Sequence, residues 1–465
     1  MYRRLLSNTV LFSVSTFGSK ILLFLLTPFY TSILTDAEYG VTDLIIQTGN
    51  VLIPLVSMGI INAVLRFGLD ETTDLKGLFT TGLVVILVGE GVLALCYPLL
   101  QSIGLLSDYV LLSDYVLLLL LYVLMANLHA VFGAMAQAMG KVRLYAVSGI
   151  LCTALVVALN ILLLSVFRLG IVGYVLSNVL ADGVVALVLF GALRLWRYFQ
   201  SAAVGRGLVR QMFRYCLPLI PATVCSWIIN ISDRYFISFL IGPDVSGLYA
   251  VGNKVASILL ILSGIFTSAW QLSIVSERSK AEQERFFSNV FSVYEAGALV
   301  GASLLMAASR LVMRFLAAPD YFSAWHYAPV LILGTAMACL GSFFASVYMA
   351  EKRSSATLVT TLAGAGVNLA GNALLIPLYG AMGAAVATLL SYLVILIARA
   401  VHSRSLLRVA WKVPRFVLAM GILLLQCVLV EWENTPLALV CCLGILALYF
   451  RPLWRAWKTG IFTRR

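Results

Sequence analysis

Long apolar runs constrain the fold of this sequence more than any other feature. Runs of 18 or more residues with few charges recur from end to end, in a chain of 465 residues that is 62% hydrophobic and 11% charged. About 20 helical residues cross the ~30 Å hydrocarbon core of a bilayer. The sequence therefore predicts an all-α polytopic membrane protein.

Fourteen segments are long and apolar enough to be candidate transmembrane helices. They are separated by short polar loops, as expected for helices that cross the bilayer in turn. The predicted spans are residues 5–34, 40–65, 78–101, 115–139, 144–167, 170–193, 213–241, 246–275, 288–316, 327–350, 355–378, 381–401, 414–432 and 435–451.

Lysine and arginine are distributed asymmetrically between the predicted loops. If the N-terminus is cytoplasmic, the cytoplasmic segments hold 26 of the 32 basic residues, and the opposite loops hold only Arg168. Cytoplasmic loops of membrane proteins carry such an excess. The pattern predicts an N-in, C-in topology. It also accounts for most of the net charge of +12 without a nucleic-acid partner.

The chain contains a weak internal repeat. Three pairs of similar stretches are each separated by 206 to 210 residues, and six predicted spans lie between the copies. An even number of spans gives both copies the same orientation, so the repeat is parallel and its axis runs along the membrane normal. The matching stretches are 29–40 and 235–247, 139–143 and 349–353, and 169–173 and 379–383.

The repeat predicts a division of the chain into three parts. Residues 1–200 would form one six-helix bundle and residues 201–410 a second one, related by a pseudo-twofold axis. Residues 411–465 would add two helices and a basic cytoplasmic tail. We expect the two bundles to enclose a central cleft.

Three basic residues, Lys20, Arg234 and Lys254, lie well inside predicted spans. A charge inside the membrane is costly and marks either a transport pathway or a structural ion pair. Counting from the outer ends of the spans places Arg234 and Lys254 about 10–12 Å deep. Lys20 lies near the midplane, in the repeat equivalent of the span that holds Arg234. Together they would attract an anion into the cleft.

Three further charged residues belong to this candidate substrate site. Asp43 could pair with Lys20. Asp233 precedes Arg234, but helix neighbours point about 100° apart, so we expect Asp233 to hold helix packing or to temper the charge. Arg66 ends the second span at the cytoplasmic face, where it either contacts substrate or anchors the helix.

Three carboxylates within spans are candidates for binding protons or Na⁺ during coupled transport. Glu90 and Glu295 align in the repeat at a separation of 205 residues, and Asp182 lies in the middle of the sixth span. Structural pairing with a cation is the alternative for each.

The sequence predicts no metal site. Its eight cysteines show no CxxC or other metal-ligand spacing. We expect His129 to be a satisfied interhelical residue rather than a ligand. The asparagines within spans are expected to hydrogen-bond between helices; they are Asn62, Asn160, Asn178, Asn230, Asn368 and Asn372.

Motifs typical of membrane enzymes are absent from the sequence. There is no GxxxxGK[ST] for ATP hydrolysis through a P-loop, and no DxD-type pair for a metal-dependent sugar transferase. The predicted outer loops reach about a dozen residues, too few to carry the chemistry of a polymerase or ligase. The first apolar stretch is too long for the core of a cleavable signal peptide. We therefore expect a transporter rather than an enzyme.

Several of these residues occur in a known pattern. Asp233-Arg234, Leu240-Ile-Gly242, Gly247-Leu-Tyr249 and Lys254 resemble the "DR…LG…GxY…K" pattern of the polysaccharide biosynthesis (oligosaccharide flippase) family. The stretch 29–40 resembles the opening of that family. The arrangement of two six-helix halves with two extra helices is similar to the multidrug/oligosaccharidyl-lipid/polysaccharide exporter superfamily. The resemblance covers nearly the whole chain.

The resemblance implies translocation of an undecaprenyl-diphosphate-linked oligosaccharide across the bacterial cytoplasmic membrane. The diphosphate is anionic and suits a cleft lined by Lys20, Arg234 and Lys254. We expect no cofactor. A membrane potential, H⁺ or Na⁺ are the candidate driving forces, and a glycan polymerase or other assembly proteins are candidate partners beside the lipid bilayer.

Four alternative functions stay open, one of them a non-transporting scaffold of the assembly machinery. A multidrug exporter of the same superfamily would depend on Glu90, Asp182 or Glu295, although Lys20 stands where proton-coupled exporters tend to have an acidic residue. A lipid II flippase would share the architecture and use the last two helices to form a groove for the lipid tail. A membrane enzyme of glycan polymerisation or ligation is the third.

Overall fold

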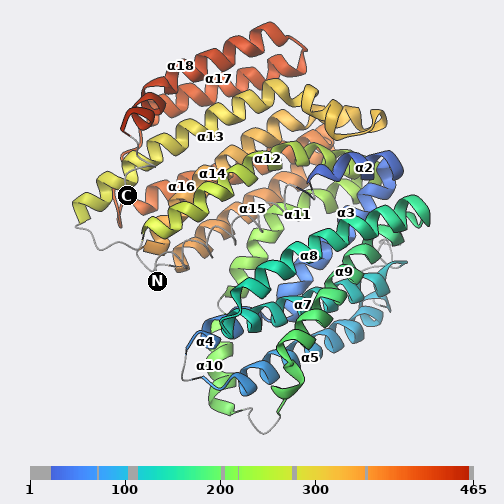
Figure 1. Ribbon diagram of the computed structural model, residues 1–465. Helices are drawn as coiled ribbons and strands as arrows, with labels where there is room; N and C mark the ends of the chain where they lie inside the picture. The colour runs from blue at the N-terminus through green and yellow to red at the C-terminus, as the bar shows by residue number, and fades with distance from the viewer. Residues whose placement is uncertain are drawn as a thin grey trace. The chain divides into compact units, whose positions relative to one another are not determined.

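The computed structural model describes residues 22, 24–70, 73–102, 114–200, 205–217, 219–274, 280–350 and 354–459. Within these ranges the chain forms helices and no β-strand (Figure 1), which confirms the predicted all-α fold. The elements are α2 (Thr27–Ile33), α3 (Asp36–Val56), α4 (Ile60–Gly68), α5 (Leu75–Ser102), α7 (Val116–Ala138), α8 (Val142–Asn160), the π-helix η1 (Ile161–Val166), α9 (Gly170–Leu193), the 3₁₀ helix η2 (Leu195–Arg197), α10 (Arg206–Cys216), α11 (Leu219–Leu240), α12 (Pro243–Ile274), α13 (Lys280–Leu316), the 3₁₀ helix η4 (Pro319–His326), α14 (Ala328–Ala350), α15 (Ser354–Tyr379), α16 (Ala381–Ser403), α17 (Val413–Glu431) and α18 (Thr435–Thr459).

Twelve of the described helices are long and apolar enough to cross a membrane. They coincide with twelve of the fourteen predicted spans. Of the other two, residues 5–34 lie mostly outside the described ranges, and residues 213–241 include α11, whose hydropathy is lowered by Asp233 and Arg234. The chain is a multi-pass membrane protein, while the count of fourteen and the topology stay predictions.

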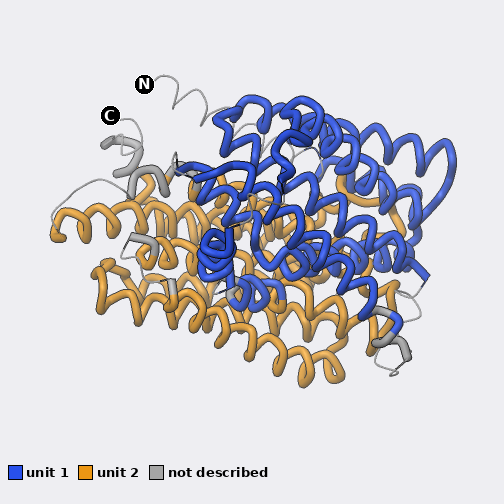
Figure 2. The backbone as a smooth tube through the Cα atoms, turned by 90° about the horizontal axis from the view of Figure 1, so that it is seen from below, with its two compact units in different colours: residues 1–227 blue, residues 228–465 orange. Residues whose placement is uncertain are grey.

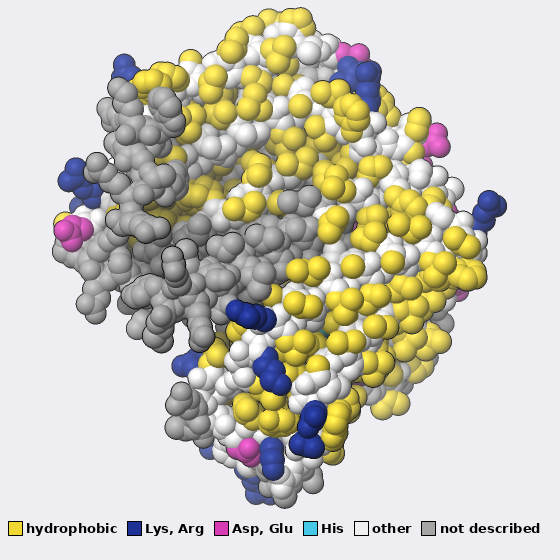
Figure 3. All heavy atoms as spheres, in the orientation of Figure 1, with side chains coloured by type: hydrophobic (Ala, Val, Ile, Leu, Met, Phe, Trp, Pro, Cys, Tyr) yellow, Lys and Arg dark blue, Asp and Glu magenta, His cyan; other side chains and the backbone are white. Residues whose placement is uncertain are grey.

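The outer surface of the helices is apolar, as contact with lipid requires. On the face drawn in Figure 3, apolar side chains predominate and charged side chains are sparse. Large apolar residues such as Leu187 and Leu378 are each 72% exposed. In water such exposure would be unfavourable, but in a bilayer it leaves the side chain in hydrocarbon.

The chain divides into two compact units, residues 1–227 and 228–465, coloured separately in Figure 2. The boundary falls inside α11, between Trp227 and Ile228. Helices α17 and α18 belong to the second unit. The expected division into residues 1–200, 201–410 and 411–465 stays a prediction.

Helix α7 is the central helix of unit 1. It packs against α3, α4, α5, α8 and α9, and Phe132 on α7 contacts the rings of Phe79 and Phe190 at centroid distances of 5.9 and 5.6 Å. Close packing drives helix association in lipid, where small residues let backbones approach. A Cβ at Gly89 would lie 2.1 Å from the carbonyl oxygen of Val56, so only glycine fits there.

Helix α14 takes the corresponding central place in unit 2. It packs against α12, α13 and α16, and 78% of its most apolar window is buried. Helices α17 and α18 pack on α13. Gln426 of α17 is fully buried; it accepts a hydrogen bond from the Ser303 hydroxyl of α13 at 2.6 Å and donates one to the Ser303 carbonyl at 2.9 Å.

The start of α3 explains part of the stretch 29–40. The backbone N–H of Glu38 donates to Thr35 Oγ1 at 3.3 Å, and the backbone N–H of Thr35 donates to Glu38 Oε2 at 2.9 Å. This reciprocal arrangement is a capping box, which satisfies two donors that a helix N-terminus would otherwise leave open. Residues Thr35 and Glu38 of this stretch therefore act first as a helix start signal.

Candidate functional site

The Asp233 carboxylate lies at the centre of a polar site inside unit 2. Its side chain is 3% exposed. The Tyr249 hydroxyl of α12 donates to Asp233 Oδ2 at 2.7 Å, and the Thr388 hydroxyl of α16 donates to the same oxygen at 2.8 Å. A buried carboxylate is stable only with such donors, so Asp233 ties α11 to two helices that follow it in the chain.

Two asparagines of α15 extend this network. Asn368 accepts a hydrogen bond from Ser232 and donates to Thr388 Oγ1 at 3.2 Å, while Asn372 donates to Ser232 Oγ at 3.1 Å. Both asparagines are fully buried, and their predicted interhelical role is confirmed. We call the set the Asp233 cluster: Ser232, Asp233, Tyr249, Asn368, Asn372 and Thr388.

The Asp233 cluster has a definite chemical capacity. It joins α11, α12, α15 and α16 by hydrogen bonds between side chains, and these are favourable where no water competes. Its acceptors are all carboxylate, amide and hydroxyl oxygens, which are also the ligands of small hard cations. It contains no imidazole nitrogen and no sulfur, the ligands that softer metal ions prefer.

Arg234 is the next residue along α11 and is 4% exposed. One guanidinium nitrogen, Nη1, donates to the carbonyl oxygen of Asn230 at 2.6 Å. The Asn230 side chain accepts a hydrogen bond from the Tyr392 hydroxyl at 2.9 Å. The Ser246 hydroxyl of α12 donates to the carbonyl oxygen of Arg234 at 3.4 Å. The guanidinium therefore lies one turn back along α11, toward Asn230.

Lys254 lies on α12 and is half-buried. Because Arg234 contacts Ser246 and Asp233 contacts Tyr249, α11 and α12 are antiparallel neighbours. In this register the Lys254 backbone lies about 12 Å further along α12 than Ser246. The backbones of the two cationic residues therefore lie about two turns apart along the helix axis, whereas counting from the ends of the predicted spans gave them similar depths.

Helix geometry favours a similar level for the two cationic groups. Side chains lean toward the N-terminus of their own helix, and the N-termini of α11 and α12 point in opposite directions. Arg234 leans toward Asn230, as observed. By the same rule we expect Lys254 to lean toward the start of α12, which would bring its ammonium closer to the level of the guanidinium.

The other predicted substrate residues lie in unit 1 or outside the described ranges. Lys20 lies outside the described residues, so its pairing with Asp43 stays a prediction. Asp43 is half-buried, and its Oδ1 accepts a hydrogen bond from Gln47 at 3.4 Å. Arg66 lies exposed in the last turn of α4, where a helix C-terminus favours a cation.

The three candidate coupling carboxylates have different surroundings. Glu295 is 1% exposed and pairs with Arg415 at 2.8 Å, the arrangement expected of a structural ion pair. Glu90 is 9% exposed, and neither of its oxygens has a hydrogen-bond partner among the described residues. Asp182 is hydrogen-bonded to His129, and the distance from Asp182 Oδ1 to His129 Nδ1 is 2.7 Å.

His129 forms the interhelical contact that the sequence predicted. It also belongs to a group of three potential metal ligands that the sequence did not predict. The Cys152 thiol donates to the same Asp182 oxygen at 3.4 Å. One ligand atom from each residue lies within 4.8 Å of the other two. The sequence could not bring these three side chains together, since they stand on three helices and produce no spacing motif.

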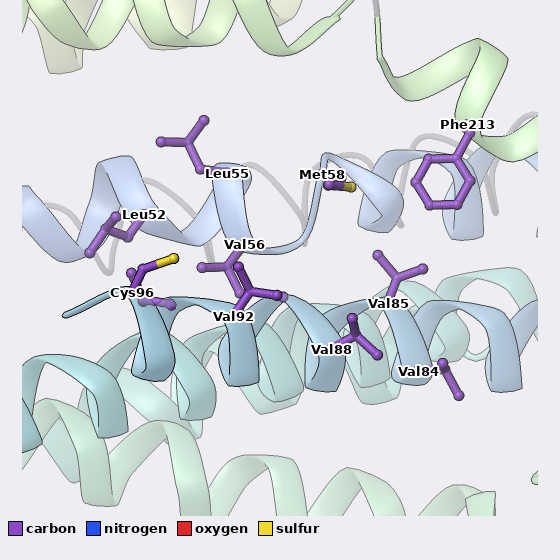
Figure 4. A pocket seen from close by; sticks show the side chains of 12 residues that line it. Leu52, Leu55, Val56, Met58, Val84, Val85, Val88, Val92, Cys96 and Phe213 are labelled. Atoms are coloured by element: carbon purple, nitrogen blue, oxygen red, sulfur yellow. The ribbon is translucent and has the colours of Figure 1, made fainter. Parts of the chain in front are cut away.

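A large apolar pocket lies in unit 1. Figure 4 shows its lining by α3, α5 and neighbouring segments, with Leu52, Val88, Val92 and Cys96 among the side chains that point into it. Its volume is about 380 Å³. With no charged side chain in its lining, this pocket has the chemistry of a site for hydrocarbon rather than for an anion.

The sequence also matches the profile of a known protein family. A sequence profile described as "Polysaccharide biosynthesis protein" matches residues 5–272, which is more than half of the chain. That range includes Asp233, Arg234 and Lys254. No protein of curated function matches the chain.

Solved structures of similar fold are membrane transport proteins. A lipid II flippase, MurJ, in an inward closed conformation is 13% identical with a TM-score of 0.73, over 97% of this chain and 100% of that one. An inward-facing multidrug resistance MATE transporter of the MOP superfamily is 14% identical with a TM-score of 0.64, over 83% of this chain and 93% of that one. A Vibrio cholerae MATE transporter is 14% identical with a TM-score of 0.58, over 86% of this chain and 94% of that one. At such identities the likeness shows a shared fold.

Proposed function

The chain belongs to the polysaccharide biosynthesis protein family, and from this premise we propose that it is a flippase for a lipid-linked oligosaccharide. The proposed substrate is an undecaprenyl-diphosphate-linked sugar, moved across a bacterial cytoplasmic membrane by alternating access. The observation that carries the proposal is the pair of cationic residues, Arg234 and Lys254, within membrane-embedded helices of unit 2.

A cation inside a membrane helix is costly and marks a candidate functional site. Arg234 is 4% exposed and lies on α11 next to Asp233 of the Asp233 cluster. Because α11 and α12 are antiparallel, we expect the side chains of Arg234 and Lys254 to lean toward a common level. Two positive groups at one level match the charge of a diphosphate better than that of a cationic drug.

The apolar part of the substrate requires no enclosed cavity. An undecaprenyl chain can stay in hydrocarbon throughout, beside the lipid-facing surface that Figure 3 shows. Only the charged and sugar groups need a polar path. The proposal needs no covalent step and no cofactor. Its driving force would be a membrane potential, H⁺ or Na⁺, for which Glu90 and the Asp233 cluster are the candidate binding groups.

The test is movement of a fluorescent undecaprenyl-diphosphate-sugar across proteoliposomes. Wild type, Arg234→Gln and Lys254→Gln would be compared at equal protein content. We expect each substitution to lower the initial rate more than tenfold, since each removes a charge that attracts the diphosphate. Arg310→Gln is the matched control, because Arg310 is a cation of the same unit that pairs with the exposed Glu433 at 3.1 Å.

The alternatives give different results in the same vesicles. Transport of cationic dyes that depends on Glu90 or Asp182, without movement of the lipid, would favour the multidrug exporter. Growth or ligation of the glycan would indicate an enzyme. Full activity of Arg234→Gln and Lys254→Gln would contradict the proposed anion site even if the lipid moves.

A further inference from the structure

Three helices of unit 1 bring a nitrogen, a sulfur and an oxygen ligand together. His129 lies on α7, Cys152 on α8 and Asp182 on α9. The Nδ1–Oδ1 distance between His129 and Asp182 is 2.7 Å, and the Sγ–Oδ1 distance between Cys152 and Asp182 is 3.4 Å. All three ligand atoms lie within 4.8 Å of one another. The side chains of His129 and Asp182 are 19% and 17% exposed.

We propose that His129, Cys152 and Asp182 form a binding site for a transition-metal ion of the Zn²⁺ class. Zn²⁺ takes imidazole nitrogen, thiolate sulfur and carboxylate oxygen at about 2.0–2.3 Å. Ligand atoms around a tetrahedral ion at those lengths lie roughly 3.3–3.7 Å apart. The three atoms here need to shift by a fraction of an ångström to about one ångström, which side-chain rotation can supply.

The hydrogen bonds at the site are those that a metal would replace. The Cys152 thiol proton points at Asp182, and the contact between His129 and Asp182 also holds a proton. Metal binding requires a thiolate and a ring nitrogen with a free lone pair. The thiol proton would leave to solvent, and a proton on Nδ1 of the neutral ring would move to Nε2. The two charges of the ion would then balance those of the thiolate and of the Asp182 carboxylate.

The donor set also determines which ions are accepted. Thiolate and imidazole ligands favour Zn²⁺ and similar ions, whereas oxygen-only sets suit Na⁺, Mg²⁺ and Ca²⁺. The site therefore differs in kind from the Asp233 cluster, whose acceptors are oxygens alone. Three protein ligands leave a fourth position for water, as in Zn²⁺ sites that are not purely structural. An ion held here would tie α7, α8 and α9 together.

The test is Co²⁺ titration of the full-length protein, purified in detergent and freed of metal. Co²⁺ replaces Zn²⁺ in such sites, and a thiolate ligand gives a charge-transfer absorption. We expect one Co²⁺ per chain with this absorption, displaced by Zn²⁺. Cys152→Ser should remove the thiolate absorption, and His129→Gln should weaken binding at least tenfold. Cys96→Ser is the matched control, since Cys96 is also half-buried in unit 1 but lines the apolar pocket.

Thermal unfolding provides a readout that does not depend on spectra. Zn²⁺ should raise the Tm of wild type and of Cys96→Ser, because a ligand that binds the folded state stabilises it, and should leave Cys152→Ser unchanged. An absent thiolate absorption in wild type would overturn the proposal. So would an absorption that persists in Cys152→Ser, or an equal Zn²⁺-dependent rise in Tm in wild type and in the double variant His129→Gln, Cys152→Ser.

Discussion

Glu90 in unit 1 and Glu295 in unit 2, which align in the predicted repeat, have different surroundings. Glu90 has no hydrogen-bond partner among the described residues. Glu295 pairs with Arg415 at 2.8 Å and accepts hydrogen bonds from Trp411 at 3.2 Å and from Tyr449 at 3.0 Å. All three partners lie in residues 411–465, the segment that we predict to follow the repeat.

In the predicted repeat, the two carboxylates have different roles. Glu90 is buried on α5 and Glu295 on α13. In unit 2 Glu295 pairs with residues of the C-terminal segment and anchors α17 and α18. In unit 1 neither oxygen of Glu90 has a hydrogen-bond partner among the described residues, and this favours Glu90 over Glu295 as a group that binds a proton or an ion.

We expect the largest effect on stability from removing Glu295, which anchors α17 and α18 to α13. Glu295→Ala leaves the Arg415 guanidinium, 14% exposed, without its carboxylate. Breaking a buried ion pair by removing one partner costs about 3–5 kcal/mol, so the Tm of the detergent-purified protein should fall sharply. The double variant Glu295→Leu, Arg415→Met should recover most of the loss. A double variant as unstable as the single one would show that the pair does more than neutralise charge.

A smaller effect is expected at the second contact between α13 and the added helices. Gln426→Leu removes the hydrogen bonds to the Ser303 hydroxyl and carbonyl. Loss of buried hydrogen bonds of this kind costs about 1–2 kcal/mol, measured by the same thermal unfolding. Ser342→Ala, at an exposed residue that bonds only within its own helix, is the control and should change the Tm little. A loss equal to that of Glu295→Ala would mean that Glu295 is not the main anchor.

The smallest effect on stability is expected in unit 1. Glu90→Gln removes no described hydrogen bond, so unfolding should change by less than about 0.5 kcal/mol. Transport should nevertheless fall severalfold if Glu90 binds the coupling ion, as measured by initial rates with and without an ion gradient. Destabilisation on the scale of Glu295→Ala would remove the contrast between the two carboxylates.

Much of this architecture follows from the sequence alone. Apolar runs locate twelve helices that the structure confirms, because length and hydropathy are local properties. The two adjacent charged residues, Asp233 and Arg234, can be recognised in the sequence as a candidate site, since a charge inside an apolar run is costly. The stretch Gly247-Leu-Tyr249 also marks the Tyr249 hydroxyl that binds Asp233.

The pairing of side chains between distant helices could not be predicted in this way. Glu295 meets Arg415 and Tyr449 only because α17 and α18 fold back on α13. His129 and Asp182 are 53 residues apart in the chain, and nothing in the sequence fixes which faces of α7 and α9 meet. The level of Lys254 relative to Arg234 depends on the register between α11 and α12, which the contacts of Ser246 and Tyr249 show and the sequence does not.

The bond between Glu295 and Arg415 joins residues 120 positions apart, and this has a consequence for biogenesis. A ribosome adds roughly 5–20 residues each second, so Glu295 enters the translocon roughly 6–24 s before its partner is synthesised. During that interval the carboxylate must stay protonated, hydrated or shielded by a chaperone. A chain truncated before residue 413 would lack Arg415, so Glu295 would never gain this partner. We expect membrane quality control to recognise and degrade such a chain.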